Sequence, residues 1–384
     1  MIRHLFKLIW NKKKAHALLM VEIWASFMVL FGLTTLIVVN VRNYSQPLGF
    51  AYQNVWAIEL NNNQDTMAVA EKAKAIFQRL KSYSDVESVS RMSNNFPFSA
   101  NTMNNMVEHN KARTLAHQYV TDENFARTLA MPVLEGSWYR RADRVGKYKP
   151  VVINQKAREE LFGDENPLGG IISDNFKVTG VVGNFKAKGE FMANQPAMFE
   201  LLDEDSSWDK TMLVRVKPGT DAIFEARLVK DITSMANGWS VEVDHLTDSR
   251  QNQHNLTLVP VIIFLIISSF LLINVGLGLF GVLNLSIARR RGEIGLRRAL
   301  GATGNGISTQ FIGEIWVLAT FGLLIGLLFA MQFPLLNVFD LEAGVYLTAI
   351  VMSVIVIYVI VTLCALFPSR QAAQIQPAVA LHEE

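Results

Sequence analysis

The side chains in this chain that could act on a substrate or hold a metal are its histidines and its single cysteine. His117, His245 and His254 stand far apart, with no carboxylate or second histidine at a metal-ligand spacing. No set of Ser, His and Asp can be picked out from spacing alone. Cys364 lies in an apolar stretch, which favours a small buried hydrophobe over a disulfide partner or thiolate ligand. The sequence therefore predicts no catalytic residue and no metal site.

Two glycine patterns bear on nucleotide binding. Gly276, Gly278 and Gly281 satisfy the spacing GxGxxG, but they lie inside a long apolar stretch, whereas a dinucleotide-binding loop follows a β-strand. Small residues in such a stretch let helices approach closely, so we expect these glycines to pack between membrane spans or across a dimer. The phosphate-binding pattern GxxxxGK(S/T) does not occur in the sequence. We therefore expect this chain to bind no cofactor.

The densest charge lies in residues 288–303, ARRRGEIGLRRALGAT, between two apolar stretches. Lys and Arg in short loops beside membrane spans stay on the cytosolic side, so this segment is expected to face the cytosol. Glu293 and Arg297 are spaced i, i+4 with the acid first, which stabilises a helix by about 0.2 to 0.5 kcal/mol. Gly301 can adopt the left-handed turn that ends a helix. The alternative is a basic loop that only fixes topology, a role that requires no particular order of residues.

Four apolar stretches are long enough to cross a membrane as helices. They cover residues 17–41, 256–287, 307–332 and 345–367. Hydrophobic residues make up 50% of the chain, yet the mean hydropathy is only +0.22, so a large aqueous part must accompany the spans. The net charge of +2 does not indicate nucleic acid binding, and the basic clusters beside the spans favour contact with anionic membrane lipids.

Two acidic residues lie within or at the edge of these spans. Glu22 and Glu314 are both near the predicted cytosolic ends. A charge inside a membrane span is costly, so such residues are functional candidates by default. The alternative is a structural ion pair with nearby basic side chains, either residues 12–14 or the arginines of residues 289–298. Both interpretations remain open.

The N-terminal residues 1–16 are basic and carry apolar side chains at helical spacing. This pattern predicts an amphipathic helix in the membrane interface, the alternative being a frayed basic leader. The apolar stretch that follows is too long for a signal peptide and lacks a small-residue cleavage site, so we expect an uncleaved first span.

The distribution of Lys and Arg also predicts the topology. Residues 333–344 contain neither, whereas the N-terminus and residues 288–306 are basic. The N-terminus, the basic loop and the tail at residues 368–384 are therefore expected in the cytosol. Residues 42–255 then form an extracytoplasmic domain.

This outer region has the pattern strand, helix, strand at both of its ends. Alternating apolar residues predict strands, and apolar residues three or four apart predict helices. The expected elements are strand 55–60, helix 67–80 and strand 86–92, then strand 212–216, helix 221–235 and strand 240–245. Residues 96–208 between these units are rich in Gly, Pro and Asn and predict an inserted β-rich subdomain, with one helix at 155–162. The expected fold is a four-span α-helical membrane protein with a large extracytoplasmic α+β domain.

Several segments resemble the FtsX/MacB-like family of ABC transporter permeases. The string EIGLRRALGA at residues 293–302 resembles the family's cytosolic loop, with Gly292 where Arg is common. The tail from Pro368 to Leu381 resembles the family's ending, and Phe311, Gly313 and Glu314 resemble the start of its third span. Four outer segments are similar to the MacB-type periplasmic core domain: LEGSW at 134–138, VVIN at 151–154, PLG at 167–169 and VVGNFK at 181–186. The resemblance covers nearly the whole chain.

The resemblance implies a half-size permease whose basic segment is a coupling helix that docks on an ATPase. The coupling residues would be Arg291, Glu293, Ile294, Leu296, Arg297, Arg298, Ala299, Leu300 and Gly301. Macrolide exporters of the family carry their own ATPase domain, and this sequence lacks the phosphate-binding loop. The resemblance therefore implies that ATP and Mg²⁺ bind a separate cytosolic ABC ATPase dimer, and that the chain itself is not an enzyme. Other implied partners are a second permease copy or homologous permease and a periplasmic adaptor or outer partner, in the bacterial inner membrane.

In the resembled family such a permease drives export, extrusion or release of a peptide, lipid, lipoprotein or drug-like cargo. The alternative is a transmembrane regulator or sensor whose outer domain controls an enzyme or signalling partner without moving cargo. A third hypothesis, a membrane-anchored enzyme, requires a convergent polar pocket in the outer domain.

Overall fold

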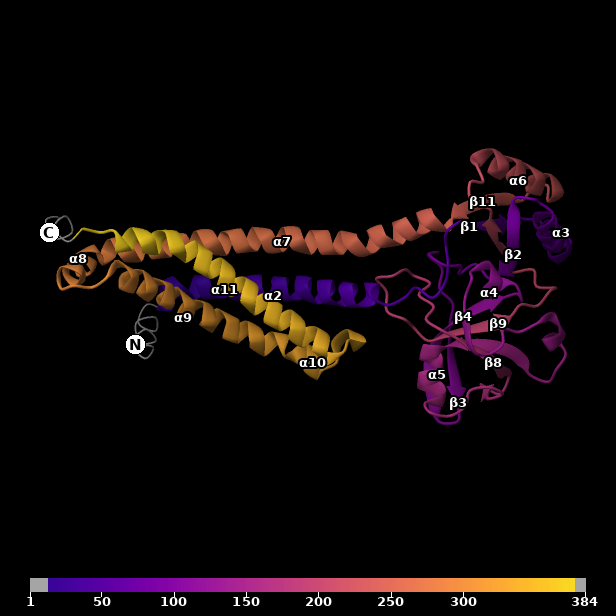
Figure 1. Cartoon of the computed structure of the whole chain (residues 1–384), viewed down its shortest axis with the longest axis horizontal. Coiled ribbons are helices and arrows are strands. Elements are labelled where there is room, and N and C mark those ends of the chain that lie inside the picture. The colour runs from indigo at the N-terminus through magenta and orange to yellow at the C-terminus, as the bar shows by residue number, and fades with distance from the viewer. Residues whose placement is uncertain (1–12, 377–384) are drawn as a thin grey trace. The chain divides into compact units, whose positions relative to one another are not determined.

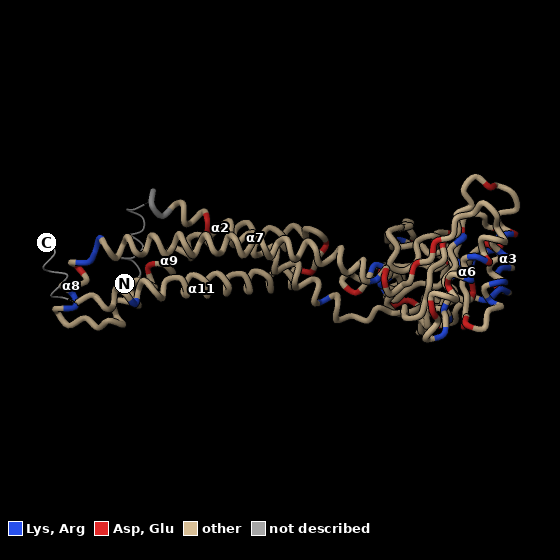
Figure 2. The backbone as a smooth tube through the Cα atoms, turned by 90° about the horizontal axis from the view of Figure 1, so that it is seen from above, with Lys and Arg blue, Asp and Glu red and all other residues tan. Residues whose placement is uncertain are grey.

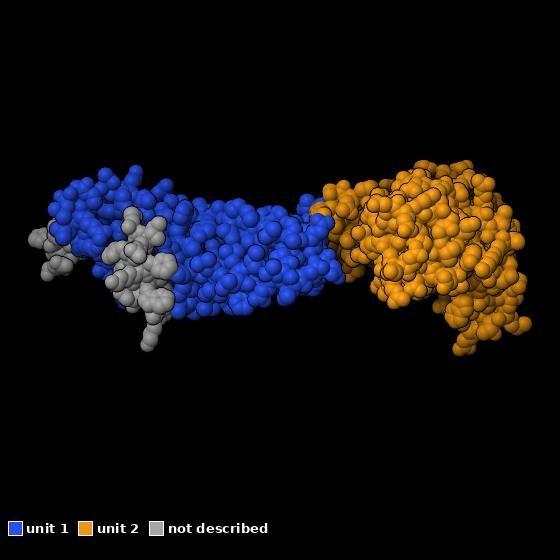
Figure 3. Space-filling model, turned by 90° about the horizontal axis from the view of Figure 1, so that it is seen from below, with its two compact units in different colours: residues 1–41, 258–384 blue, residues 42–257 orange. Residues whose placement is uncertain are grey.

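The computed structural model describes residues 13–376. The predicted interfacial helix at residues 1–16 lies mostly outside the described part, as does the end of the tail. The chain divides into two compact units (Figure 3). One unit consists of Met1–Val41 and Leu258–Glu384, and the other is Arg42–Thr257.

The first unit contains the helices that are long and apolar enough to cross a membrane. They are α2 (Lys13–Tyr44), α7 (Leu246–Arg289), α9 (Gly304–Ala330) and α11 (Ala343–Ala373). Short helices α10 (Gln332–Leu335) and η2 (Val338–Asp340) connect the last two (Figure 1). Four such helices agree with the predicted fold class. Helix α7 begins well before the predicted residue 256. The prediction missed this part because residues 246–255 are mostly polar, and a search for apolar stretches does not detect a polar helix.

The membrane helices pack through large apolar residues and through glycines. Ile23 and Phe27 of α2 are fully buried. A Cβ atom added to Gly326 of α9 would lie 2.4 Å from Cδ1 of Phe27, and one added to Gly322 would lie 2.9 Å from Cγ2 of Ile23. Helices α2 and α9 therefore approach each other where α9 has no side chain.

Helix α7 is the least covered of the four. Only 6% of its most apolar window is buried, against 44% in α2, 39% in α9 and 28% in α11. Much of its apolar surface is therefore free to contact lipid or another protein.

The second unit contains the predicted strand, helix, strand units. Strand β1 (Val55–Asn61), helix α3 (Val69–Lys81) and strand β2 (Val86–Met92) form the first. Strand β10 (Thr211–Val216), helix α6 (Ala222–Met235) and strand β11 (Ser240–His245) form the second. The strands lie in the order β11-β1-β10-β2 with antiparallel neighbours, so the two units interleave as in a ferredoxin-like βαββαβ fold.

The block between these units is rich in short strands, as predicted. Its strands are β3 (Asn104–His109), β4 (Ala112–Thr121), β5 (Val133–Gly136), β6 (Lys149–Asn154), β7 (Ile171–Ile172), β8 (Phe176–Val182) and β9 (Ala197–Leu201). Its helices are α4 (Phe125–Thr128), η1 (Arg141–Arg144) and α5 (Gln155–Phe162). Strand β4 pairs with β2, so the inserted strands extend the same sheet instead of forming a separate one. The sheet is mixed, since β4 and β9, and also β6 and β8, run parallel.

Residues that alternate along β1 enter two different cores. Trp56 and Ile58 pack with the buried faces of α3 and α6. Val55 and Ala57 pack instead with an aromatic core of the inserted block, which contains Phe185. This alternation is the period-two pattern of a strand buried on both faces.

Candidate functional site

The basic segment between α7 and α9 forms a separate short helix, α8 (Arg291–Ala299). Glu293 and Arg297 form an ion pair on its surface. After α8 the chain turns at Gly301, whose φ is +96°. The amide of Gly301 donates to Arg298 O at 3.1 Å, and that of Ala302 donates to Arg297 O at 3.0 Å, which satisfies the last carbonyls of the helix.

One face of α8 is anchored and the other is free. The side chain of Ile294 is only 4% exposed and packs in the core of the membrane unit. Leu296 is 52% exposed and Leu300 is 80% exposed. Among the apolar residues assigned to docking from the sequence, the structure therefore turns Ile294 inward and leaves Leu296 and Leu300 accessible.

Lys and Arg residues gather along the backbone around α8 (Figure 2). Polar contacts tie α8 and its flanks to two other helices. The guanidinium of Arg290 is 2.9 Å from Oε1 and 3.2 Å from Oε2 of Glu314 in α9. Arg297 donates to Oε1 of Gln310 in α9 at 2.8 Å, and Arg298 donates to the carbonyl of Ala373 at the end of α11. A displacement of α8 would therefore act directly on α9 and α11.

The other membrane residues selected from the sequence fall in different environments. A Cβ on Gly276 would lie 2.8 Å from Sγ of Cys364, and one on Gly278 would lie 2.9 Å from Cδ2 of Leu19. A Cβ on Gly281 would meet no atom of the described residues within 4 Å. Of the three glycines, the first two therefore serve packing among the described helices.

Glu22 differs from Glu314. Its Oε2 atom is buried and accepts no hydrogen bond within the described part of the chain. It lies against Gly278, whose added Cβ would be 3.0 Å from that oxygen. The two acidic residues grouped by the sequence therefore do not share one environment.

A second polar site lies in the outer unit, where α7 begins. Glu190 accepts from Nε of Arg250 at 2.6 Å and lies 2.7 Å from Nε2 of His254. The side chains of all three are at most 21% exposed. Burial alone would raise the pKa of Glu190, but the hydrogen bonds from His254 and Arg250 outweigh it, so the pKa is lowered. Glu190 is therefore a charged anchor for the first turns of α7.

The same loop also holds the end of α2. Lys186 is 1% exposed, and its ammonium donates to the carbonyl of Asn43 at 2.5 Å and to that of Glu190. Asn43 returns a hydrogen bond to the carbonyl of Phe191 at 2.8 Å. Burial lowers the pKa of Lys186. Residues 185–191, which we call the anchor loop, therefore connect the C-terminal end of α2 with the N-terminal end of α7.

Sequence reasoning did not find the anchor loop. It had assigned no role to His254 and had used Lys186 only as part of a family-like string. The partners are 60 or more residues apart, so no local pattern connects them. Within residues 13–376 no group of three or more His, Cys, Asp or Glu side chains is arranged to hold a metal.

Comparisons with known proteins match both units. The family described as MacB-like periplasmic core domain matches residues 24–230, and the family described as FtsX-like permease C-terminal matches residues 263–377. The macrolide export ATP-binding/permease protein MacB of Chlorobium luteolum is 27% identical over 327 residues, or 79% of this chain and 48% of that protein. The pyoverdine export ATP-binding/permease protein PvdT of Pseudomonas aeruginosa is 26% identical over 288 residues, or 69% of this chain and 42% of that protein. This chain thus spans about half the length of these relatives.

Among solved structures, the periplasmic region of MacB from Actinobacillus actinomycetemcomitans aligns with 56% of this chain and 96% of its own, at 16% identity and a TM-score of 0.40. The core-domain match alone covers more than half of the chain, and the second match covers the helices on both sides of α8. The protein belongs to the FtsX/MacB-like family of ABC transporter permeases and is a membrane protein with a periplasmic-type domain.

Proposed function

We propose that this chain is the permease part of an ABC transporter in the bacterial inner membrane, driven by a separate cytosolic ATPase dimer. In this arrangement α8 and both termini face the cytosol, and the outer unit faces the periplasm. The arginines around α8 favour that orientation. ATP and Mg²⁺ are bound by the ATPase, and the permease converts its closure into movement of the outer unit.

The observation that carries the proposal is the division of α8 into an anchored and a free face. Leu296 and Leu300 offer apolar side chains that a groove on another protein can bury. Ile294 fixes α8 to the membrane unit on the opposite side. Because Arg290 and Arg298 join this segment to α9 and α11, a push on the leucines is passed to two membrane helices at once.

Helix α7 provides the route to the outer unit. It is one helix of 44 residues, about 66 Å long at 1.5 Å per residue, which exceeds the roughly 30 Å of the hydrocarbon core. Its first turns bind the anchor loop through Arg250 and His254. Movement of α7 along or about its axis would therefore reach the sheet through β8, which directly precedes that loop.

A second permease copy, or a homologous permease, would cover the free side of α7. An apolar groove runs between α7 and α11 and is lined by Gly276, Leu277, Phe280 and Leu363, among others. Gly281 of α7, where an added Cβ would meet no described atom within 4 Å, leaves room for another helix to approach closely within a membrane. Two permeases would then match the two subunits of an ATPase dimer.

The test is to reconstitute the permease with its ATPase in vesicles and to compare Leu296→Asp and Leu300→Asp with the wild type. The matched control is Val145→Asp, which changes an apolar side chain that is 91% exposed in the outer unit. We expect both α8 variants to insert normally but to lose ATPase binding and permease-stimulated ATP hydrolysis, whereas the control keeps both. Unchanged stimulation in the α8 variants would refute the coupling role.

The same vesicles distinguish transport from regulation. If the permease moves cargo, ATP hydrolysis changes the compartment in which a peptide, lipid, lipoprotein or drug-like compound is found. If it is a regulator, ATP changes only the activity of a partner bound to the outer unit.

A further inference from the structure

The groove between α7 and α11 has room for a bound molecule. It measures about 550 Å³, within the roughly 300 to 1,000 Å³ of sites that hold a small molecule. Its walls are apolar, and Leu277 and Leu363 on its two sides are exposed. In a membrane such a groove takes either a lipid acyl chain or another helix. The lining residues include Leu272, Ile273, Leu277, Phe280, Ile360 and Leu363.

The groove leads along α11 towards the C-terminal end of that helix. The rings of Phe280 and Phe367 stack at this end, with their centroids 6.1 Å apart. Arg370 follows Phe367 by three residues and Leu363 by seven. Residues at these spacings share one side of a helix, so Arg370 lies on the same side of α11 as the groove.

Two arginines at this end carry charges that no carboxylate of the described residues balances. Arg370 is exposed and makes no ion pair or hydrogen bond within residues 13–376. Arg298 of α8 donates to the carbonyl of Ala373 and pairs with no carboxylate in the same part of the chain. Since α8 lies beside the ends of α7 and α11 (Figure 1), the guanidinium of Arg298 is at the end of α11, one helical turn from Arg370.

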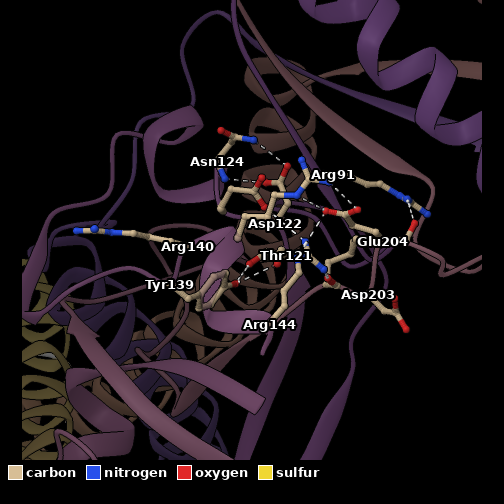
Figure 4. Close-up of polar contacts among 12 residues, drawn as sticks. Arg91, Thr121, Asp122, Asn124, Tyr139, Arg140, Arg144, Asp203 and Glu204 are labelled. Carbon is tan, nitrogen blue, oxygen red and sulfur yellow. Dashed lines mark hydrogen bonds and ion pairs between the residues drawn. The ribbon is translucent and has the colours of Figure 1, made fainter. Parts of the chain in front are cut away.

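The charged cluster of the outer unit differs, because its groups are engaged within the chain (Figure 4). Arg91 is only 4% exposed and donates to the carbonyl of Glu204 at 3.1 Å, and Arg144 lies 3.6 Å from a carboxylate oxygen of the same residue. Asp122 accepts from the amide of Asn124 at 3.0 Å. That cluster balances its own charges, whereas the two arginines at the end of α11 do not.

Distances along α11 match one leaflet of a bilayer. Ile360 is the first groove residue of α11 and lies ten residues before Arg370, about 15 Å at 1.5 Å per residue. The hydrocarbon core is roughly 30 Å thick, so one leaflet takes about half of it. A phospholipid whose phosphate lies at Arg370 therefore has its acyl chains beside the groove.

The charges also argue against a second copy of this chain in the groove. All copies have the same orientation in the membrane, so a second copy would bring its own arginines to the end of the groove, where like charge opposes binding. The second permease proposed above can instead approach at Gly281. This residue lies five positions after Gly276, about 140° around α7, so a lipid and a second permease would occupy different sides of the helix.

We propose that the groove and the two arginines bind an anionic phospholipid of the leaflet in which α11 ends. An acyl chain lies along Leu277 and Leu363, and the phosphate accepts hydrogen bonds from Arg370 and Arg298. Arginine suits this role because its planar guanidinium can donate two hydrogen bonds to one phosphate. The lipid connects α8 with α11, in addition to the contact between Arg298 and Ala373. This site goes beyond the proposed docking of an ATPase and does not depend on it.

The test uses the full chain, purified in detergent and given equal amounts of phosphatidylglycerol and phosphatidylcholine before native mass spectrometry. Both lipids carry a phosphate, but the choline group cancels its charge. We expect the chain to retain phosphatidylglycerol about tenfold or more over phosphatidylcholine. Arg370→Gln and Arg298→Gln should each lower this retention about fivefold, the contribution expected of one arginine beside an anionic lipid.

Matched controls separate the site from the general charge and hydrophobicity of the helices. Arg289 is an exposed arginine at the end of α7, but it follows Phe280 by nine residues and lies on the opposite side of that helix from the groove. Arg289→Gln should therefore leave retention unchanged. Leu363→Trp fills the groove and should lower retention at least about threefold, whereas Leu347→Trp, at an exposed position of α11 outside the groove, should not.

The proposal is wrong if both lipids are retained equally, or if Arg370→Gln, Arg298→Gln and Leu363→Trp retain phosphatidylglycerol as well as the wild type does. An equal loss in Arg289→Gln would show a diffuse basic surface and overturn the proposed site. Glycerol 3-phosphate has the phosphate but no acyl chain. If it displaces phosphatidylglycerol at an equal concentration, the arginines form a site for a free anion and the proposal is also overturned.

Discussion

The anchor loop allows a quantitative prediction for the substitution Glu190→Gln. The carboxylate of Glu190 binds Arg250 at 2.6 Å and His254 at 2.7 Å, with side-chain exposures of 13%, 21% and 12%, so solvent screens the contacts little. A hydrogen bond to a charged group contributes about 1.5 to 3 kcal/mol. Glutamine can accept only one of the two bonds, and its amide then faces a donor. We therefore expect local opening of the first turns of α7 to become easier by about 2 to 3 kcal/mol.

Native-state hydrogen exchange measures this opening directly. Amides of residues 247–257 should exchange about 30 to 150 times faster in Glu190→Gln than in the wild type, at one factor of ten per 1.4 kcal/mol. The matched control is Asp205→Asn, which breaks an exposed ion pair with Lys74. The side chain of Lys74 is 41% exposed and that of Asp205 is 82% exposed. Exchange in α3 should change by less than about threefold in the control. Protection of α7 that is unchanged in Glu190→Gln would show that this cluster does not hold the helix.

Three further predictions concern other parts of the chain. Gly301→Ala should destabilise the C-terminal end of α8 by about 1 to 2 kcal/mol, because alanine is strained at a φ of +96°. Faster hydrogen exchange of the Ala302 amide would report this loss, and Gly301→Asn should destabilise the helix end less. Gly326→Ala should lower the melting temperature in detergent because its Cβ would meet the ring of Phe27. Gly313→Ala should not lower it, because a Cβ there would meet no atom of the described residues within 4 Å; equal melting temperatures would contradict the packing argument. Burial, which outweighs the hydrogen bonds from Ser90 and Asn124, raises the pKa of Asp122 to about 6, above the unfolded value of about 3.9. The stability that protonated Asp122 contributes is therefore fully present below about pH 4, and about 3 kcal/mol of it is lost as the pH rises through about 6. The unfolding free energy measured against pH should show this loss in the wild type but not in Asp122→Asn.

Local patterns predicted most of the elements. The helix at 155–162 was placed correctly, and Gly163 follows its last residue as expected. The structure adds that the side chain of Asn154 caps its start by accepting from the amide of Ala157. Strand β11 has the bounds expected from its alternating apolar residues. The four membrane helices followed from length and hydropathy, although the polar start of α7 did not.

Contacts between segments that lie far apart in the chain could not be predicted from local sequence patterns. The junction of β2 and β4, which makes one sheet of the outer unit, depends on the register of Met92 with Thr121. The contact of Glu190 with His254 likewise joins segments with no shared local pattern. The sequence also could not show that Ile294 of α8 is buried. The apolar residues of α8 alone do not say which face of the helix packs against its neighbours.

The central claim, that α8 docks on an ATPase, is tested most directly by site-specific cross-linking. Cys364 is the only cysteine, so Cys364→Ala gives a background to which single cysteines can be added at Leu300, at Leu296 or, as a control, at Val145. Each is labelled with a short photoreactive maleimide and irradiated with the copurified ABC ATPase. We predict a permease–ATPase product from positions 300 and 296 and none from 145. An ATPase that copurifies but is cross-linked from neither leucine would contradict the account.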